Sequence, residues 1–272
     1  MDKNGLGPIE NTLFVPMLGR IYASEHVPAI LHDEKALELK AQLPETVMEH
    51  DTQTQYTYLA SASRSANMDR RIRDFLKRKP DGVIIQLGIG LETTYSRNDN
   101  GHTQWYGVDL PHVIAYRRSL LPETPRETYL AGDAFAGAWL QEVRRKYPEA
   151  PLLITASGLF HYFKEEKIIA LIHMLQDQGY SELLFDAVSQ SGLTMMKLKY
   201  MKTVGHKEVP MYFYVDSAKE FAKKAGPGVS VLAEENFYEH IPRAGLSFVT
   251  KMSMVIADLL GMVRMIHLKL GE

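Results

Sequence analysis

The 272-residue chain has no cysteine, almost no net charge and no long apolar run. Without cysteine there is no disulfide, no thiolate nucleophile and no iron–sulfur cluster, so only histidine and carboxylate could ligate a metal. The 31 Lys and Arg against 33 Asp and Glu leave a net charge of −2. That balance gives no bulk attraction to nucleic acid or to an anionic membrane.

The apolar stretches, such as 83–91 and 254–265, are shorter than the about 20 residues of a membrane span or are interrupted by charge. Residues 1–8 are polar and glycine-rich, unlike a targeting segment. The histidines show no metal-binding spacing. We therefore expect a cytoplasmic protein with no metal, no membrane partner and no nucleic acid partner. The sequence leaves open whether the protein forms a homodimer.

From Val83 onward, short β-branched runs alternate with helical stretches, which is typical of a mostly parallel sheet covered by helices. The last run alternates apolar and polar residues, as an antiparallel or edge strand does. The seven expected strands are 83–87, 104–108, 128–131, 152–155, 182–186, 229–233 and 264–270.

Helix signals lie between these strands. Pro111 begins one expected helix, 111–120, and Gly179 ends another, 164–178. Asp216 is expected to cap the helix that ends at Gly226. The stretch 246–260 is apolar on most faces, so we expect it to be buried.

Two segments do not follow this alternation. Residues 1–80 contain helical stretches, such as 35–43 and 68–79, but no convincing strand, and residues 189–215 are inserted after the fifth strand. We interpret 1–80 as an N-terminal helical cap and 189–215 as a lid, both over an α/β domain of residues 81–272. Ligands of such sheets bind at the carboxyl ends of the strands. The alternative for both segments is a structural helix packed elsewhere.

The sharpest local feature is the turn Gly88-Ile89-Gly90 after the first strand, where backbone can approach a ligand closely. Asp109 lies 21 residues after Gly88 at the end of the second strand, and Asp133 follows the third. Either acid alone fits a helix N-cap equally well. Together the three strand ends favour a nucleoside-binding crevice.

The kind of nucleoside follows from what the turn lacks. Thr93 stands where a dinucleotide fingerprint has its third glycine, which disfavours NAD. The chain also has no Gly-Lys-Ser/Thr, so an NTPase is not expected. A nucleoside with an amino-acid tail fits better, and S-adenosylmethionine is the common one.

These residues also carry a family resemblance. The stretches 87–93 (LGIGLET), 105–111 (WYGVDLP), 129–133 (YLAGD) and 157–163 (SGLFHYF) resemble the leucine carboxyl methyltransferase family. The likeness is to its bacterial branch of polyketide O-methyltransferases, of the tetracenomycin type. It implies a class I, Rossmann-like methyltransferase fold: an α/β fold with a seven-stranded, mostly parallel sheet, an antiparallel last strand and helices on both faces.

The resemblance also implies roles for individual residues. Gly88 and Gly90 would lie against the methionyl part of S-adenosylmethionine, and Arg64 would pair with its carboxylate. Asp109, with Leu110 beside it, would bind the ribose, and Asp133, with Ala134 beside it, would lie near the adenine. Glu92 and Ser157 are also placed at the cofactor, although the family usually has Asp and Glu at these two positions.

Candidate acceptor residues follow the fourth strand and occupy the lid. His161 is a candidate general base and Tyr162 a candidate positioning residue, the alternative being an interior His and Tyr. Tyr200, His206, Tyr212 and Tyr214 are candidate substrate contacts, the alternative being plain packing.

We therefore expect a methyltransferase that uses S-adenosylmethionine to methylate an oxygen of a small molecule, either polyketide-like or a carboxylate. One alternative is a binding protein that retains the crevice without turnover, which Ser157 motivates. A weaker alternative is an NAD-dependent dehydrogenase.

Overall fold

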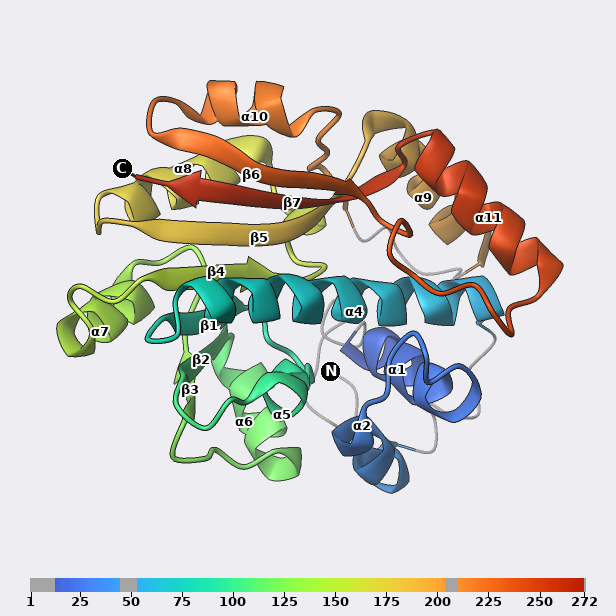
Figure 1. The fold of residues 1–272 in the computed structure, drawn as a ribbon, viewed down its shortest axis with the longest axis horizontal. Coiled ribbons are helices and arrows are strands. Elements are labelled where there is room, and N and C mark those ends of the chain that lie inside the picture. Colours follow the sequence, from blue (N-terminus) through green and yellow to red (C-terminus); the bar gives the residue numbers. More distant parts are fainter. Residues whose placement is uncertain (1–12, 45–52, 204–209, 272) are drawn as a thin grey trace.

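The computed structural model describes residues 13–44, 53–203 and 210–271, with side chains left out at 198–203. One mixed sheet of seven strands runs through the molecule in the order β3-β2-β1-β4-β5-β7-β6 (Figure 1). β7 is antiparallel to both of its neighbours, and the other pairings are parallel. The strands are β1 (Val83–Leu87), β2 (Gln104–Asp109), β3 (Glu127–Ala131), β4 (Leu152–Ala156), β5 (Ser181–Val188), β6 (Val229–Asn236) and β7 (Val263–Leu270). The predicted fold class, including the antiparallel last strand, is confirmed.

The register of the central strands brings their carboxyl ends to one edge. Leu87, the last residue of β1, pairs with Val108 of β2 and with Ala156 of β4. β2 in turn pairs Asp109 with Ala131 at the end of β3. The segments that follow these four strands therefore begin side by side, and most of the candidate cofactor-binding residues lie at these strand ends or in these segments.

Helices cover both faces of the sheet, because consecutive residues of a buried strand point to opposite sides. Ile85 packs in the core with α7, α8 and α10, whereas Ile84 packs with α4 and α11. Figure 1 shows α4 crossing the front of the strands. The helices are α1 (Phe14–His26), α2 (Glu34–Leu39), α4 (Gln55–Arg78), α5 (Thr94–Asn98), α6 (Pro111–Leu120), α7 (Ala138–Lys146), α8 (Glu165–Gln176), α9 (Gln190–Thr203), α10 (Ala218–Ala225) and α11 (Phe248–Leu259), with short 3-10 turns η2 (Lys40–Gln42) and η3 (Phe160–Tyr162).

The N-terminal region contributes helices and no strand within its described residues, 13–44 and 53–80. Its last helix, α4, is part of the sheet's own core through Ile72 and Phe75. α1 and α2 instead pack against Leu91, beyond the glycine turn, and Leu121, after α6. The cap at residues 1–80 stays a prediction, and the structure adds that α4 belongs to the sheet face.

Two local predictions are wrong. Ser217, not Asp216, caps α10, because its hydroxyl accepts the N–H of Glu220 at 3.3 Å. Asp216 is turned toward α9, where it accepts the N–H of Gln190 at 2.9 Å. α11 is only half buried, since Met254 faces the core while the opposite side of the helix faces solvent.

Among the described residues, no helix has the length and apolarity that crossing a bilayer requires.

Candidate functional site

The turn after β1 is held against the end of β2. Gly88 and Gly90 have φ of 62° and 48°, a backbone region that favours glycine. Gly88 N–H donates to the carbonyl of Val108 at 2.9 Å, and Gly90 N–H donates to Oδ2 of Asp109 at 2.8 Å. The turn predicted as a close-approach element is therefore tied to the predicted ribose-binding acid.

The same turn also packs tightly on two leucines. A Cβ at Gly88 would lie 2.8 Å from Leu159, and one at Gly90 would lie 2.6 Å from Leu13. The positive φ angles and these close approaches therefore favour glycine at both positions before any ligand is considered. A substitution at Gly90 cannot by itself separate loss of cofactor binding from loss of this packing.

Asp109 is a largely enclosed carboxylate at the end of β2. Its Oδ1 accepts the N–H of Leu110 at 2.8 Å, and its Oδ2 accepts the N–H of Gly90. Burial raises the pKa of Asp109, and the two backbone N–H groups offset this only in part. Because a carboxylate offers about four lone-pair sites, two donors leave it able to accept hydroxyl hydrogens as well.

Asp133 lies beside Asp109, in the segment after β3. The two segments are joined by the N–H of Gly132, which donates to the carbonyl of Asp109 at 2.8 Å. Asp133 is exposed and accepts the N–H of Phe135 at 2.9 Å, while Ala134 is buried. A cavity of about 190 Å³ lies here, lined by Gly132, Asp133 and Trp139 among others. A Cβ at Gly132 would meet no atom within 4 Å, so there is open space at this strand end.

Asp186 on β5 organises the segment that follows β4, and the sequence analysis missed it. Its Oδ1 accepts the N–H of Gly158 at 2.7 Å, and its Oδ2 accepts Nε–H of Arg64 at 2.9 Å. Nε2 of His161 lies 3.2 Å from the same Oδ2. The available signal was its place at the end of an expected strand, the same signal that identified Asp109.

The charge of Asp186 is stabilised although the side chain is buried. Burial acts to raise the pKa of Asp186, but Arg64, His161 and the N–H of Gly158 outweigh it and hold the pKa below its usual range. Asp186 is therefore an ionised acceptor at neutral pH. It connects α4, which carries Arg64, to the η3 turn, which carries His161.

His161 is a buried side chain with one ring nitrogen engaged and one not. When Nε2 donates to Asp186, Nδ1 retains its lone pair, and this enclosed atom has no hydrogen-bond partner among the described residues. Tyr162 is half-buried and packs against the cluster of Val188, Leu193 and Met211. The structure therefore places Tyr162 against α9, and His161 against β5.

Arg64 and Ser157 lie at the same strand ends. The guanidinium of Arg64 lies over Gly158, whose Cβ would come 2.7 Å from Nη1. Ser157 is half-buried at the end of β4, directly before Gly158. Arg64 and His161 thus both contact the carboxylate of Asp186. The predicted roles of Arg64 and Ser157 at the cofactor stay predictions.

Glu92 has a different environment from the one predicted. Its carboxylate forms ion pairs with Arg20 at 3.1 Å and with Arg97 at 3.0 Å. Burial acts to raise the pKa of Glu92, but these two guanidinium groups outweigh it and lower the pKa well below its usual range. Glu92 therefore joins the glycine turn to α1, and its role at the cofactor stays a prediction.

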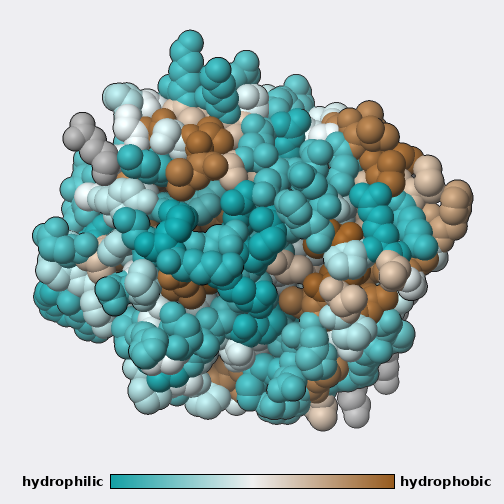
Figure 2. Space-filling view, in the orientation of Figure 1, coloured by the Kyte–Doolittle hydropathy of each residue, from teal (hydrophilic) through white to brown (hydrophobic). Residues whose placement is uncertain are grey.

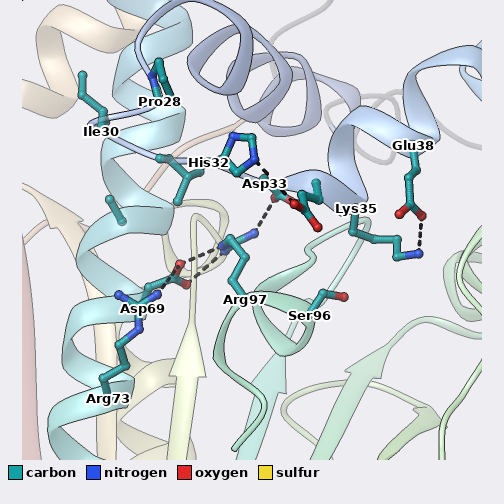
Figure 3. A pocket seen from close by; sticks show the side chains of 13 residues that line it. Pro28, Ile30, His32, Asp33, Lys35, Glu38, Asp69, Arg73, Ser96 and Arg97 are labelled. Carbon is teal, nitrogen blue, oxygen red and sulfur yellow. Dashed lines mark hydrogen bonds and ion pairs between the residues drawn. The ribbon is translucent and has the colours of Figure 1, made fainter.

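A cavity of about 400 Å³ lies outside this buried ion-pair cluster and not at the strand ends. Figure 3 shows Arg97 reaching between Asp69 and Asp33 at its inner wall. Exposed side chains of both signs, such as Lys35 and Glu38, form much of its rim. All polar groups of Arg97 that point inward are engaged with carboxylates, so we assign the candidate site to the strand ends.

The lid candidates are only partly described. Tyr212 and Tyr214 are exposed, and Tyr212 N–H donates to the carbonyl of His161 at 2.8 Å. Tyr200 lies on α9, but its side chain is outside the described residues, and His206 lies outside them entirely. Across 13–44, 53–203 and 210–271, no three His, Asp or Glu side chains are grouped to hold a metal ion, and the expected lack of a metal stays a prediction.

Three known proteins that resemble this chain in sequence or in structure are methyltransferases by name. The tetracenomycin polyketide synthesis O-methyltransferase TcmP of Streptomyces glaucescens is 26% identical over 182 residues, which span 66% of each protein, just under two thirds. A putative methyltransferase from Thermobifida fusca has a similar structure, with a TM-score of 0.58, 16% identity and coverage of 97% and 98% of the two chains. Magnesium protoporphyrin IX methyltransferase from Synechocystis, solved with bound S-adenosylhomocysteine, follows with a TM-score of 0.51, 10% identity and coverage of 93% and 98%.

The structural likenesses identify the fold, and the sequence identifies the family. Residues 15–176 match the leucine carboxyl methyltransferase family, which is more than half of the chain. The matched region includes the glycine turn, Asp109, Asp133 and His161. The chain belongs to the leucine carboxyl methyltransferase family.

Proposed function

We propose that the protein transfers a methyl group from S-adenosylmethionine to an oxygen of a small-molecule acceptor. The observation that carries this is the glycine turn held to Asp109 at the carboxyl ends of β1 and β2, in a chain of a methyltransferase family. The relative TcmP, named as a polyketide O-methyltransferase, supports the choice of an oxygen acceptor. The Synechocystis structure with S-adenosylhomocysteine supports the cofactor.

The residues present fit such a cofactor. Asp109 is an enclosed carboxylate whose remaining lone pairs would accept the ribose hydroxyls, and their donation would offset the burial that raises its pKa. The open space at Gly132, beside Asp133, suits the neighbouring adenine. Leu110 and Ala134 would flank it, and Arg64 and Ser157 would lie toward the methionyl end.

When bound, S-adenosylmethionine supplies a methyl group on a positively charged sulfur. The protein's task is then to hold the acceptor oxygen in line with that group. Such positioning can supply about 7–11 kcal/mol of the barrier. A carboxylate acceptor is already ionised at pH 7, whereas a phenol gains from a base with a near-neutral pKa.

For a phenol acceptor we propose His161 as the general base, oriented by Asp186. With Nε2 bound to Asp186, Nδ1 is the nitrogen left to take a proton. Because Nδ1 is enclosed, the side chains over it must move aside for the acceptor. His161→Asn should then abolish methylation of a phenol acceptor, together with the rise of that rate with pH that a general base produces. The rate of methylation of a carboxylate acceptor should not change.

The decisive experiment is calorimetry with S-adenosylmethionine and S-adenosylhomocysteine, followed by an assay of S-adenosylhomocysteine release with phenol and carboxylate acceptors. Binding with product supports the proposal. Binding without product from any acceptor would favour a protein that only binds the cofactor. Absence of binding, or tight binding of NAD instead, would overturn it. The cytoplasmic location and the lack of a nucleic acid partner stay predictions.

A further inference from the structure

One side of α11 is an apolar surface that the fold leaves uncovered. Figure 2 shows hydrophobic atoms gathered where Figure 1 draws this helix, at one end of the molecule. Five residues of α11 and its C-cap residue Leu260 are exposed: Phe248 77%, Val249 72%, Met252 41%, Ile256 46%, Leu259 80% and Leu260 62%. We call these six residues the α11 stripe. A helix of 12 residues with so much apolar exposure is unusual on a monomer.

The spacing of the stripe is that of a helix-pairing seam. Val249, Met252, Ile256 and Leu259 follow one another at intervals of three, four and three residues. This is the spacing at which one helix packs its side chains into a second helix. Met254 and Ala257 already pack in the core with α4, so the seam lies on the opposite side of α11 from these core contacts.

The stripe is also symmetric about residue 254. Met252 and Ile256 lie two positions from it, Val249 and Leu259 lie five, and Phe248 and Leu260 lie six. A sequence pattern that reads the same in both directions is what a two-fold axis requires of an antiparallel helix pair, because each residue then meets its mirror position on the other copy. Val249 would meet Leu259, and Met252 would meet Ile256.

The charge and the exposed area of the α11 stripe both suit packing against the same stripe of a second copy of the chain. The stripe has no charged residue, and the flanking Lys251 and Asp258 would lie opposite positions 257 and 250, not opposite themselves. Taking about 150 Å² for each fully exposed large side chain, the stripe presents on the order of 600 Å² per copy. Two copies then bury about 1,200 Å², the lower end for a specific interface.

We propose that the protein forms a reversible homodimer through antiparallel pairing of its two α11 helices about a two-fold axis at residue 254. The surface lies on the opposite side of α11 from α4, which carries Arg64. The dimer therefore does not depend on the proposed methyl transfer, and either can fail without the other.

Sedimentation of the full chain over a wide concentration range tests the association. We expect a monomer–dimer equilibrium in the wild type and at least about a tenfold weaker dimer for Val249→Lys or Leu259→Glu, each at a well-exposed position. The double variant Val249→Lys with Leu259→Glu should restore the dimer, because antiparallel pairing places each lysine opposite a glutamate. Leu232→Lys, at a 44% exposed leucine on β6, is the control and should dimerise like the wild type.

The absence of cysteine allows a direct check of orientation. Val249→Cys with Leu259→Cys should give a covalent dimer on oxidation. Val249→Cys alone should not, because its two copies would lie about 15 Å apart along the helices, beyond disulfide range. A wild type that is monomeric at every concentration, single variants that dimerise normally, or cross-linking through Val249→Cys alone would each overturn the proposal. So would binding of neutral phospholipid vesicles by a chain that does not dimerise.

Discussion

The carboxylate of Asp186 holds the guanidinium of Arg64 at 2.9 Å, although the two residues are 122 positions apart in the sequence. The contact joins the helix on one face of the sheet to a central strand. It also lies at the end of β5, next to the loop that carries Ser157 and His161. We therefore expect the ion pair between Arg64 and Asp186 to affect both the stability of the fold and the geometry of the proposed site.

Replacing Arg64 should make the fold more sensitive to acid. A carboxyl group with a lowered folded pKa stabilises the fold above its unfolded pKa of about 3.9, and loses this contribution as the pH falls through the folded value. Asp186 is such a group, with Arg64 as its main favourable charge. Arg64→Gln should raise that pKa, so stability is lost at a less acidic pH, with a cost of about 3 kcal/mol at pH 7.

Urea unfolding between pH 7 and pH 3 measures this effect. Lys146→Gln is the matched control, because it breaks an exposed pair with Glu142 and should leave the pH profile unchanged. If Arg64→Gln and the control gave the same profile, the pair with Asp186 would not govern acid stability.

Asp109→Ala should weaken binding of S-adenosylmethionine by about 1–3 kcal/mol, the cost of losing a charged hydrogen-bond acceptor at an enclosed site. Calorimetry measures the affinity, and a melting curve establishes that the variant is folded, since Asp109 also holds Gly90. Asp177→Ala, at the exposed end of α8, should bind normally. An unchanged affinity in a folded Asp109→Ala variant would remove Asp109 from the site.

Glu92→Gln should destabilise the fold strongly, because it leaves Arg20 and Arg97 beside a neutral side chain in a buried cluster. We expect a loss of about 3–5 kcal/mol in the free energy of unfolding. Glu25→Gln removes an ion pair with Lys40 at the surface and should cost about 0–1 kcal/mol. Equal costs measured by urea unfolding would contradict a structural role for Glu92.

Gly90→Ala should destabilise the protein even without cofactor. A positive φ costs an alanine about 1–2 kcal/mol, and the new Cβ would also meet Leu13 at 2.6 Å. Gly101→Ala carries the φ cost alone, because its Cβ would have no neighbour within 4 Å. Gly90→Ala should therefore lower the melting temperature more than Gly101→Ala does, and this excess should shrink in a Leu13→Ala background. An excess that persists there would mean that the contact with Leu13 is not its cause.

The order of elements could be predicted from local patterns. Each of the seven strands appears within a few residues of its expected range, because β-branched runs and glycine or proline boundaries act over short stretches of chain. The glycine turn and the acids Asp109 and Asp133 could be selected as candidates by the same signal, since each lies at a strand end or within three residues of one. The family prediction is confirmed on these same motifs.

Contacts between distant elements could not be predicted in this way. Nothing local to Glu92 indicates that Arg20 approaches it from α1, 72 positions earlier. Nor does periodicity show which side of α11 meets the core, because its sequence is apolar on most faces. Asp216 was likewise predicted as a helix cap from its local sequence, whereas in the fold it accepts the N–H of Gln190 on α9, 26 positions earlier.

The sequence by itself determined the strands, the turn after β1 and the family, because hydrophobic period, glycine and proline act through neighbouring residues. Only the tertiary structure decided which charges pair around Asp186 and Glu92, and that α11 presents an apolar side to solvent. The physical reason is that burial and ion pairing depend on which surfaces the packed sheet and helices bring together, and many arrangements of distant segments share the same local pattern.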